Sequence, residues 1–192
     1  TEGQVLIDAT PTTSLARQDI VQRVSLVPQK AYLFSGTVAS NLRLGRPEAT
    51  DEELWESLRV AQADFVEVLD MLIAQGGTNV SGGQRQRLSI ARMLVARPLV
   101  YLFDDSFSAL DVATDAKVRA AMQASFAKRE QPVTSIIVAQ RVASIRDADQ
   151  ILVLDAGRIV DRGTHEELLG RCAVYQEIVD SQETAAAAGG AN

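Results

Sequence analysis

Short runs of apolar, often β-branched residues alternate along this chain with longer segments in which apolar residues recur every three or four positions. The short runs predict strands at residues 4–7, 24–27, 99–104, 135–138 and 150–154. The longer segments predict helices at residues 51–61, at residues 81–95 and from residue 112 to about residue 128. Strands that alternate with helices of these lengths predict an α/β fold with a mostly parallel sheet and flanking helices.

Capping residues and prolines mark where several of these elements begin and end. Thr50 and Glu53 have the spacing of a capping box, so a helix is expected to begin at residue 51. Pro28 stops the predicted strand at residues 24–27, and Pro98 ends the predicted helix at residues 81–95. Both follow because proline has no backbone N–H to donate. Asp111 is expected to cap the next long helix.

Two adjacent carboxylates follow the most apolar of the strands. Residues 99–103 are all apolar, which predicts burial on both faces as in a parallel sheet, and residues 135–138 and 150–154 are also expected to be buried. Ligands of such sheets bind at the carboxyl ends of the strands, where Asp104 and Asp105 lie. Acids in this position commonly hold a hydrated Mg²⁺ near a nucleotide phosphate, whereas the plainer alternative is a pair of solvated acids that begin a loop.

Composition narrows the classes of function. The chain has 192 residues and a formal net charge of −6 with interspersed acids and bases, which argues against a nucleic-acid partner held by phosphate contacts. The single cysteine, Cys172, excludes an internal disulfide framework and is expected to be a small buried apolar residue. No apolar run approaches the roughly 20 residues that a membrane-spanning helix needs, and the first residues do not resemble a signal peptide.

A predicted helix that begins with two glycines precedes Asp104 and Asp105 in the sequence. Residues 79–87 read Asn-Val-Ser-Gly-Gly-Gln-Arg-Gln-Arg, and two glycines at a helix start leave backbone N–H groups open to an anion. The segment resembles the LSGGQ signature motif of ATP-binding-cassette (ABC) ATPases, with Val80 in the leucine position. The resemblance implies ATP contacts for Ser81, Gly82, Gly83 and Gln84.

The resemblance extends over most of the chain. The motifs that match are the Q-loop at residues 28–29, the exporter-type segment at 33–42, the Walker B strand at 99–104, the D-loop at 108–111 and the exporter C-terminal helix at 163–168. The roles it implies are Mg²⁺ contacts for Gln29 and Asp104, further ATP contacts for Ser108 and Asp111, and catalytic positions for Asp105 and Gln140. The implied fold is a P-loop NTPase-like ABC ATPase core with an α-helical signature subdomain.

One motif of the family is absent from the printed sequence. The phosphate-binding loop G-x-x-x-x-G-K-[ST] needs a Gly-Lys pair, and the chain has none. We therefore expect residues 1–180 to be a partial ABC domain that lacks its P-loop, with the helical subdomain at about 37–97 and a disordered tail at 181–192. Such a chain is expected to expose core surface and, by itself, neither to bind ATP tightly nor to hydrolyse it.

Two further departures concern the catalytic positions. The family has glutamate after the Mg²⁺-binding aspartate, but Asp105 is about one methylene shorter, and a displacement of about 1 Å can lower a rate ~10²-fold. Gln140 stands in the position of the switch histidine and cannot carry a proton as imidazole does. The only histidine of the chain is His165, in the C-terminal helix motif.

An intact signature beside two altered catalytic positions resembles the degenerate half of a heterodimeric ABC exporter. The resemblance implies a second nucleotide-binding domain and a transmembrane domain as partners, ATP and Mg²⁺ as cofactors, no nucleic acid, and a place at the cytoplasmic face of the cell membrane. Two alternatives remain open. One is a non-transport ABC ATPase, and the other is a regulatory module that binds ATP without turnover.

Overall fold

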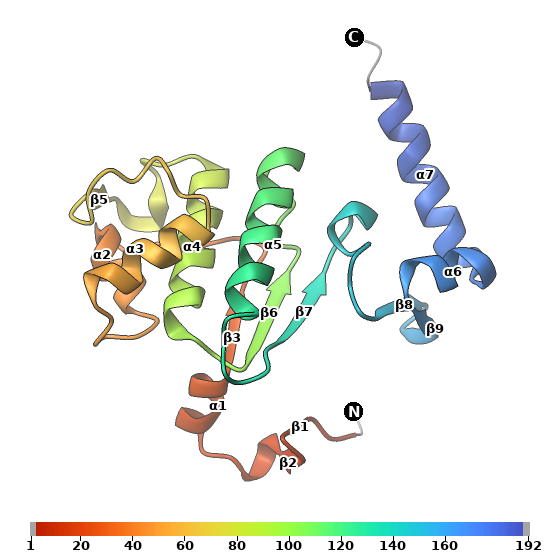
Figure 1. The fold of residues 1–192 in the computed structure, drawn as a ribbon, viewed down its shortest axis with the longest axis horizontal. Helices are drawn as coiled ribbons and strands as arrows, with labels where there is room; N and C mark the ends of the chain where they lie inside the picture. Colours follow the sequence, from red (N-terminus) through yellow and green to blue (C-terminus); the bar gives the residue numbers. More distant parts are fainter. Residues whose placement is uncertain (1–2, 190–192) are drawn as a thin grey trace. The chain divides into compact units, whose positions relative to one another are not determined.

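The computed structural model describes residues 3–189, with side chains through residue 184, and its contacts divide the chain into two compact units (Figure 1). The first unit runs to Val138 and the second begins at Ala139. The elements of the first unit are β1 (Leu6–Ile7), β2 (Thr10–Pro11), α1 (Arg17–Arg23), β3 (Val24–Val27), β4 (Gly36–Thr37), α2 (Val38–Arg43), α3 (Asp51–Val60), β5 (Leu72–Ile73), α4 (Gly82–Ala96), β6 (Val100–Asp104), α5 (Val112–Phe126) and β7 (Thr134–Val138). Those of the second unit are β8 (Ile151–Asp155), β9 (Arg158–Gly163), α6 (His165–Arg171) and α7 (Ala173–Gly189).

A parallel three-stranded sheet forms the centre of the first unit. Its strand order is β3-β6-β7, and Val27, Phe103 and Ile137 lie side by side across it. The predicted strands at residues 24–27, 99–104 and 135–138 and their parallel arrangement are thereby confirmed. The predicted strand at residues 4–7 is shorter, because only Leu6 and Ile7 pair with β2.

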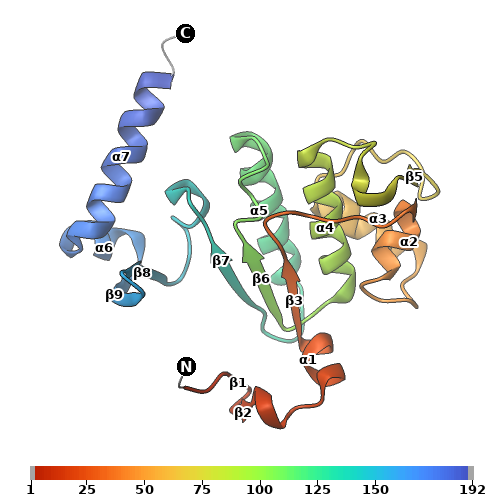
Figure 2. The ribbon, with the colours of Figure 1, turned by 180° about the vertical axis from the view of Figure 1, so that it is seen from behind.

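The two faces of this sheet differ in cover. Tyr101 and Phe103 point to the face on which helices pack and are buried, whereas Leu26, Ile136 and Val138 are 56%, 51% and 58% exposed. Figures 1 and 2 show α4 and α5 on one side of the sheet, and no helix of this unit covers the opposite side in the part of the chain that is described. The prediction that β6 is buried on both faces and that β7 is buried is therefore wrong, while the expected exposure of core surface is observed.

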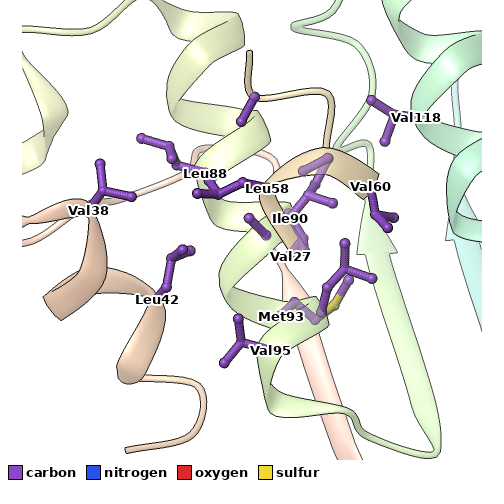
Figure 3. Close-up of a cluster of buried hydrophobic side chains, with 14 of the residues drawn as sticks. Val27, Val38, Leu42, Leu58, Val60, Leu88, Ile90, Met93, Val95 and Val118 are labelled. Atoms are coloured by element: carbon purple, nitrogen blue, oxygen red, sulfur yellow. The ribbon is translucent and has the colours of Figure 1, made fainter. Parts of the chain in front are cut away.

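The main apolar core lies between the sheet and helices α2, α3 and α4 (Figure 3). Leucine, valine and isoleucine side chains of the three helices meet there because the apolar residues of each recur at helical spacing. Figure 3 labels Val38, Leu42, Leu58, Val60, Leu88, Ile90, Met93 and Val95 of these helices, together with Val27 of β3 and Val118 of α5. This core fixes α4, whose first residues carry the predicted signature, against strand β3, which ends at Val27.

The helix boundaries follow the capping residues. The Thr50 hydroxyl accepts a hydrogen bond from the Glu53 amide and the Glu53 carboxylate accepts one from the Thr50 amide, as predicted. Helix α4 ends at Ala96, and its C-cap residue, Arg97, has a φ of 50° and directly precedes Pro98. Left-handed backbone at this position closes the helix before the proline can interrupt it.

Gly45 marks a close approach between the end of α2 and the backbone of α4. A Cβ atom on Gly45 would lie 2.3 Å from the carbonyl oxygen of Arg92. We expect Gly45→Ala to lower the free energy of unfolding by about 3 kcal/mol, because the two backbones must separate. Urea unfolding measures this effect. Gly170→Ala is the control, since a Cβ there meets no atom within 4 Å, and an equal loss in both variants would contradict the explanation.

The second unit is an antiparallel pair of strands with two helices. Strand β8 takes the place of the predicted strand at 150–154, with partial burial, and pairs with β9. Cys172 is buried, as expected, beside a hydrogen bond of 2.8 Å between His165 Nδ1 and the Tyr175 hydroxyl. Within the described part of the chain, no helix combines the length and apolar character needed to span a membrane.

The end of the chain differs from the predicted disordered tail. Helix α7 continues through Ser181 and ends at Gly189, and residues 190–192 lie outside the described residues. Composition alone suggested disorder because the segment is rich in small residues. Alanine, however, has the highest helix propensity of all residues, so a helix that enters an alanine run extends at little cost.

Candidate functional site

The two strand-end acids differ in burial and backbone conformation. Asp104 is the last residue of β6 and is exposed. Asp105 is only 7% exposed, has a φ of 45°, and its amide donates a hydrogen bond of 2.9 Å to the carbonyl oxygen of Val138. Left-handed backbone turns the chain sharply at Asp105, so the two carboxylates are presented to different surroundings.

Gln29 lies beside Asp105 at the same edge of the sheet. Strand β3 pairs in parallel with β6 and ends at Val27, so the chain leaves both strands at their carboxyl ends. The Gln29 Nε2 donates a hydrogen bond of 2.9 Å to Oδ2 of Asp105. The structure therefore brings together two of the residues that the sequence placed at one site, although they are separated by 76 positions.

The loop after Asp105 is held by serine side chains. The hydroxyl of Ser106, which is fully buried, donates a hydrogen bond of 2.7 Å to the carbonyl oxygen of Val27. The hydroxyl of Ser108 donates one of 2.8 Å to the carbonyl oxygen of Asp105. These two bonds fix the position of Asp105 relative to the end of β3.

Asp111 begins helix α5, as predicted. Its carboxylate accepts hydrogen bonds from the hydroxyl and the amide of Thr114, and these bonds lower its pKa below the usual value for aspartate. The side chain is exposed. A capping carboxylate at a helix N-terminus is stabilised in its charged form because bare amide groups face it.

The predicted signature residues form the start of α4. Ser81 is the N-cap: its hydroxyl accepts a hydrogen bond of 3.2 Å from the Gln84 amide, and its own amide donates one of 2.9 Å to Oε1 of Gln84. A Cβ on Gly82 would meet no atom within 4 Å, and one on Gly83 would lie 3.3 Å from the carbonyl oxygen of Ala109. The first turn of α4 is thus open on one side, and its amide groups can bind an anion.

Gln140 is the second residue of the second unit. Its carbonyl oxygen accepts a hydrogen bond of 2.7 Å from Nε2 of Gln182 on α7. Within the first unit the structure brings Gln29 to Asp105 and places the signature start near the loop that contains Ala109. The roles of these residues toward ATP and Mg²⁺ remain predictions.

Sequence reasoning missed two buried polar residues of this site, Gln86 and Ser106. Gln86 is 1% exposed, and its Nε2 donates a hydrogen bond of 3.2 Å to the carbonyl oxygen of Pro28. One signal was available, because Gln86 lies four residues before Ile90, on the buried side of α4. A polar residue at a buried helical position must have a partner, which the sequence alone does not identify.

The residues present fit a Mg²⁺ ion that is shared with a nucleotide. Among the residues described, no cluster of three or more His, Cys, Asp or Glu side chains could hold a metal ion. A Mg²⁺ ion bound between protein and phosphates needs only one or two carboxylates, because waters and phosphate oxygens supply its other ligands. Asp104, exposed at the end of β6, and the amide oxygen of Gln29 have this chemistry.

Comparisons with known proteins give a consistent result. A family model described as ABC transporter matches residues 1–108. An uncharacterized ABC transporter ATP-binding protein of Mycobacterium tuberculosis is 49% identical over 99% of this chain, and a fatty acid ABC transporter ATP-binding/permease protein of Mycobacterium bovis is 39% identical over 92%. A solved structure of a bacterial Atm1-family ABC exporter with ATP bound is 35% identical, with a TM-score of 0.87 over 94% of this chain.

These relatives are considerably longer than the chain. It spans 33% of the M. tuberculosis protein, 28% of the M. bovis protein and 32% of the exporter chain in the solved structure. The similarity therefore concerns one region of each of these proteins.

Proposed function

The chain belongs to the ABC transporter family, and on this premise we propose that it is the degenerate-site nucleotide-binding domain of a heterodimeric exporter. Its signature residues complete an ATP site with the partner domain. Its own strand-end acids belong to a second site that retains ATP and turns it over slowly, and Gln140 is the altered residue at the sequence position of the switch histidine. The two sites together couple ATP binding and hydrolysis to transport by a transmembrane domain at the cytoplasmic face of the membrane.

The main evidence for this proposal is the side chain of Asp105. It is buried, shorter than the glutamate of the family motif, and engaged by the Gln29 amide at 2.9 Å. A general base must reach the water from which it takes a proton, and a deficit of about 1 Å can lower the rate ~10²-fold. Asp105 is therefore suited to hold its neighbours in place rather than to activate water.

Asp104 and Gln29 would hold Mg²⁺ in this site. When bound, the ion would neutralise charge on the nucleotide phosphates. Asp104 offers an exposed carboxylate, and Gln29 can offer its amide oxygen while its Nε2 donates to Asp105. Ser108 and Asp111 keep the adjoining loop and the start of α5 in position, through the Asp105 carbonyl and the Thr114 amide respectively.

The start of α4 supports an active role of this chain in the partner's ATP site, in contrast to the slow turnover proposed for its own site. Ser81 and Gly82 are exposed, and the space beside Gly82 is free of other atoms of the chain. Donors that are already oriented toward developing charge stabilise a transition state without rearrangement. The signature of this chain is thus suited to a γ-phosphate that the partner domain holds.

An exposed aromatic pair supports the contact with a transmembrane domain. Tyr32 and Phe34 stack edge to face at 5.2 Å and are 44% and 53% exposed, while the buried Asn41 side chain bonds both the amide and the carbonyl of Phe34. A groove lined by Phe34, Leu44 and Arg92 lies beside them. A partly apolar groove of this kind is suited to receive a short helix of the transmembrane domain.

A single-turnover experiment on the complete transporter tests the proposal. With labelled ATP at both sites, we expect one nucleotide of each pair to be cleaved and the other to remain intact and bound, because Asp105 is too short to activate water. Separation of protein-bound ATP from ADP over time measures both fractions.

Three results of this experiment are distinguishable. Equal and fast cleavage at both sites would show that Asp105 is a competent base and would contradict the degenerate assignment. No cleavage at either site would favour the regulatory module. ATP cleavage without any dependence on a membrane domain would favour a non-transport ATPase.

A further inference from the structure

Three side chains from two other segments hold the end of strand β3 in place. The carbonyl oxygen of Val27 accepts from the Ser106 hydroxyl at 2.7 Å, and that of Pro28 accepts from Gln86 Nε2 at 3.2 Å. The next side chain, Gln29, donates to Asp105 at 2.9 Å. We refer to residues 27–29 as the 27–29 junction. Consecutive residues of this junction are thus tied to the loop after β6 and to helix α4.

Burial makes the hydrogen bonds of Gln86 and Ser106 costly to break. Gln86 is 1% exposed and Ser106 is fully buried, so neither side chain can exchange its partner for bulk water. A buried polar group that loses its partner is destabilised by the full cost of its desolvation. Loss of the bond between Gln86 and Pro28 is therefore costly, so a displacement of α4 is expected to move the 27–29 junction with it.

The same helix approaches the loop after Asp105 near its first turn, three residues before Gln86. The Cβ position of Gly83 lies 3.3 Å from the carbonyl oxygen of Ala109, and the neighbouring Ser108 hydroxyl bonds the carbonyl oxygen of Asp105. The hydrogen bonds therefore connect Asp105 through the 27–29 junction to α4 at Gln86, and the backbone at Gly83 lies close to the loop that follows Asp105.

We propose that Gln86 is a positioning residue that couples the two ATP sites served by this chain. The inference rests on the proposed function, in which the start of α4 faces the nucleotide of the partner and Asp105 faces the nucleotide of this chain. Displacement of the signature by nucleotide is passed by Gln86 to the Pro28 carbonyl, and Gln29 then changes the position of the Asp105 carboxylate. Coupling of this kind is shown only by a measured interaction between the residues, since a chain of contacts does not establish it.

A double-mutant cycle on the complete transporter tests the coupling. The variants are Gln86→Leu, Asp105→Asn and the pair, and the measured quantity is the dissociation rate of the retained labelled ATP. We expect Gln86→Leu alone to change this rate by about 3- to 10-fold, as coupled neighbours do, and to change it by less than about 2-fold when Asp105→Asn is also present. The same change in both backgrounds would show that Gln86 acts only in packing and would overturn the proposal.

Ser89→Ala is the matched control for damage to α4. Ser89 is 3% exposed on the same helix and contributes no bond to the 27–29 junction among those described, so its loss reports general destabilisation. An effect of Ser89→Ala on the dissociation rate as large as that of Gln86→Leu would also overturn the proposal.

A second cycle applies if Gln86→Leu fails to assemble. Gln29 is exposed and Gly82 has open space, so Gln29→Ala and Gly82→Ala leave the core intact. We expect the effect of Gly82→Ala on the retained nucleotide to be lost when Gln29→Ala is present, and additive effects would count against the coupling. If the unmodified transporter retains no ATP, the proposed function fails, and the same cycles on steady-state hydrolysis still decide whether Gln86 couples to Asp105.

Discussion

Gly83→Asp is expected to abolish nearly all ATP hydrolysis by the assembled transporter. A side chain at this position meets the carbonyl oxygen of Ala109, which lies 3.3 Å from its Cβ position. In the proposed function it also adds negative charge beside the γ-phosphate that the partner domain holds. Loss of one oriented donor at such a site lowers the rate by about 10²–10³. Repulsion between two anions adds to this loss. Steady-state ATPase rates in the presence of the intact partner domain measure the effect.

Asp105→Asn is the matched comparison and is expected to retain most of the activity. In the degenerate-half assignment the site of Asp105 contributes little turnover, so removal of its charge changes little. Asparagine also keeps an oxygen that can accept the hydrogen bond from Gln29. In a symmetric ABC dimer the loss of this acid would be as damaging as the loss of the signature, so an Asp105→Asn transporter as inactive as Gly83→Asp would rule out the assignment.

The local elements could be predicted because their signals are local. The boundaries of β3 and α3 follow from Pro28 and from the Thr50 capping box, and the start of α4 from Ser81. Each of these residues acts on backbone groups within four positions. The sequence therefore contains both the signal and its target.

Burial of the strands could not be predicted in the same way. An apolar run such as residues 99–103 indicates a strand that is able to be buried on both faces, but cover depends on which other segments are present. In the described chain α4 and α5 cover only one face, so Leu102 is partly exposed and Ile136 is 51% exposed. The alternation of burial along β6 is a property of the tertiary packing.

The candidate site was predicted from motifs, whereas its internal bonds were not. The Gln29–Asp105 bond joins positions 76 apart, and the Gln86–Pro28 bond joins positions 58 apart. Such pairs are created by the parallel register of β3 and β6 and by the packing of α4, which place distant residues at one edge of the sheet. A motif gives the identity of a residue, and the register decides which group that residue faces.

Asp105→Glu is expected to raise the cleavage rate of the retained ATP by about 10- to 100-fold, because the added methylene moves the carboxylate about 1 Å toward the water. The substitution has an opposing effect on stability. Asp105 has a φ of 45°, a region that aspartate tolerates better than glutamate, so the variant is expected to lose roughly 1 kcal/mol in its free energy of unfolding. Gln140→His added to Asp105→Glu is expected to raise the rate further, since imidazole can carry a proton at this position.

The single-turnover assay with labelled ATP measures this gain directly, as a faster loss of the intact bound nucleotide. Asp104→Glu is the matched control: it adds the same methylene at the neighbouring acid, but Asp104 is assigned to the metal, so no gain is expected. A gain in both variants would mean that added length acts through general loosening of the loop. One outcome is that Asp105→Glu leaves the retained ATP uncleaved while Asp105→Glu combined with Gln140→His cleaves it. The low rate would then be due chiefly to Gln140, because a longer carboxylate alone did not restore cleavage. If neither variant cleaves it, the chemical identity of these two residues does not explain the retention, and the degenerate assignment loses its basis.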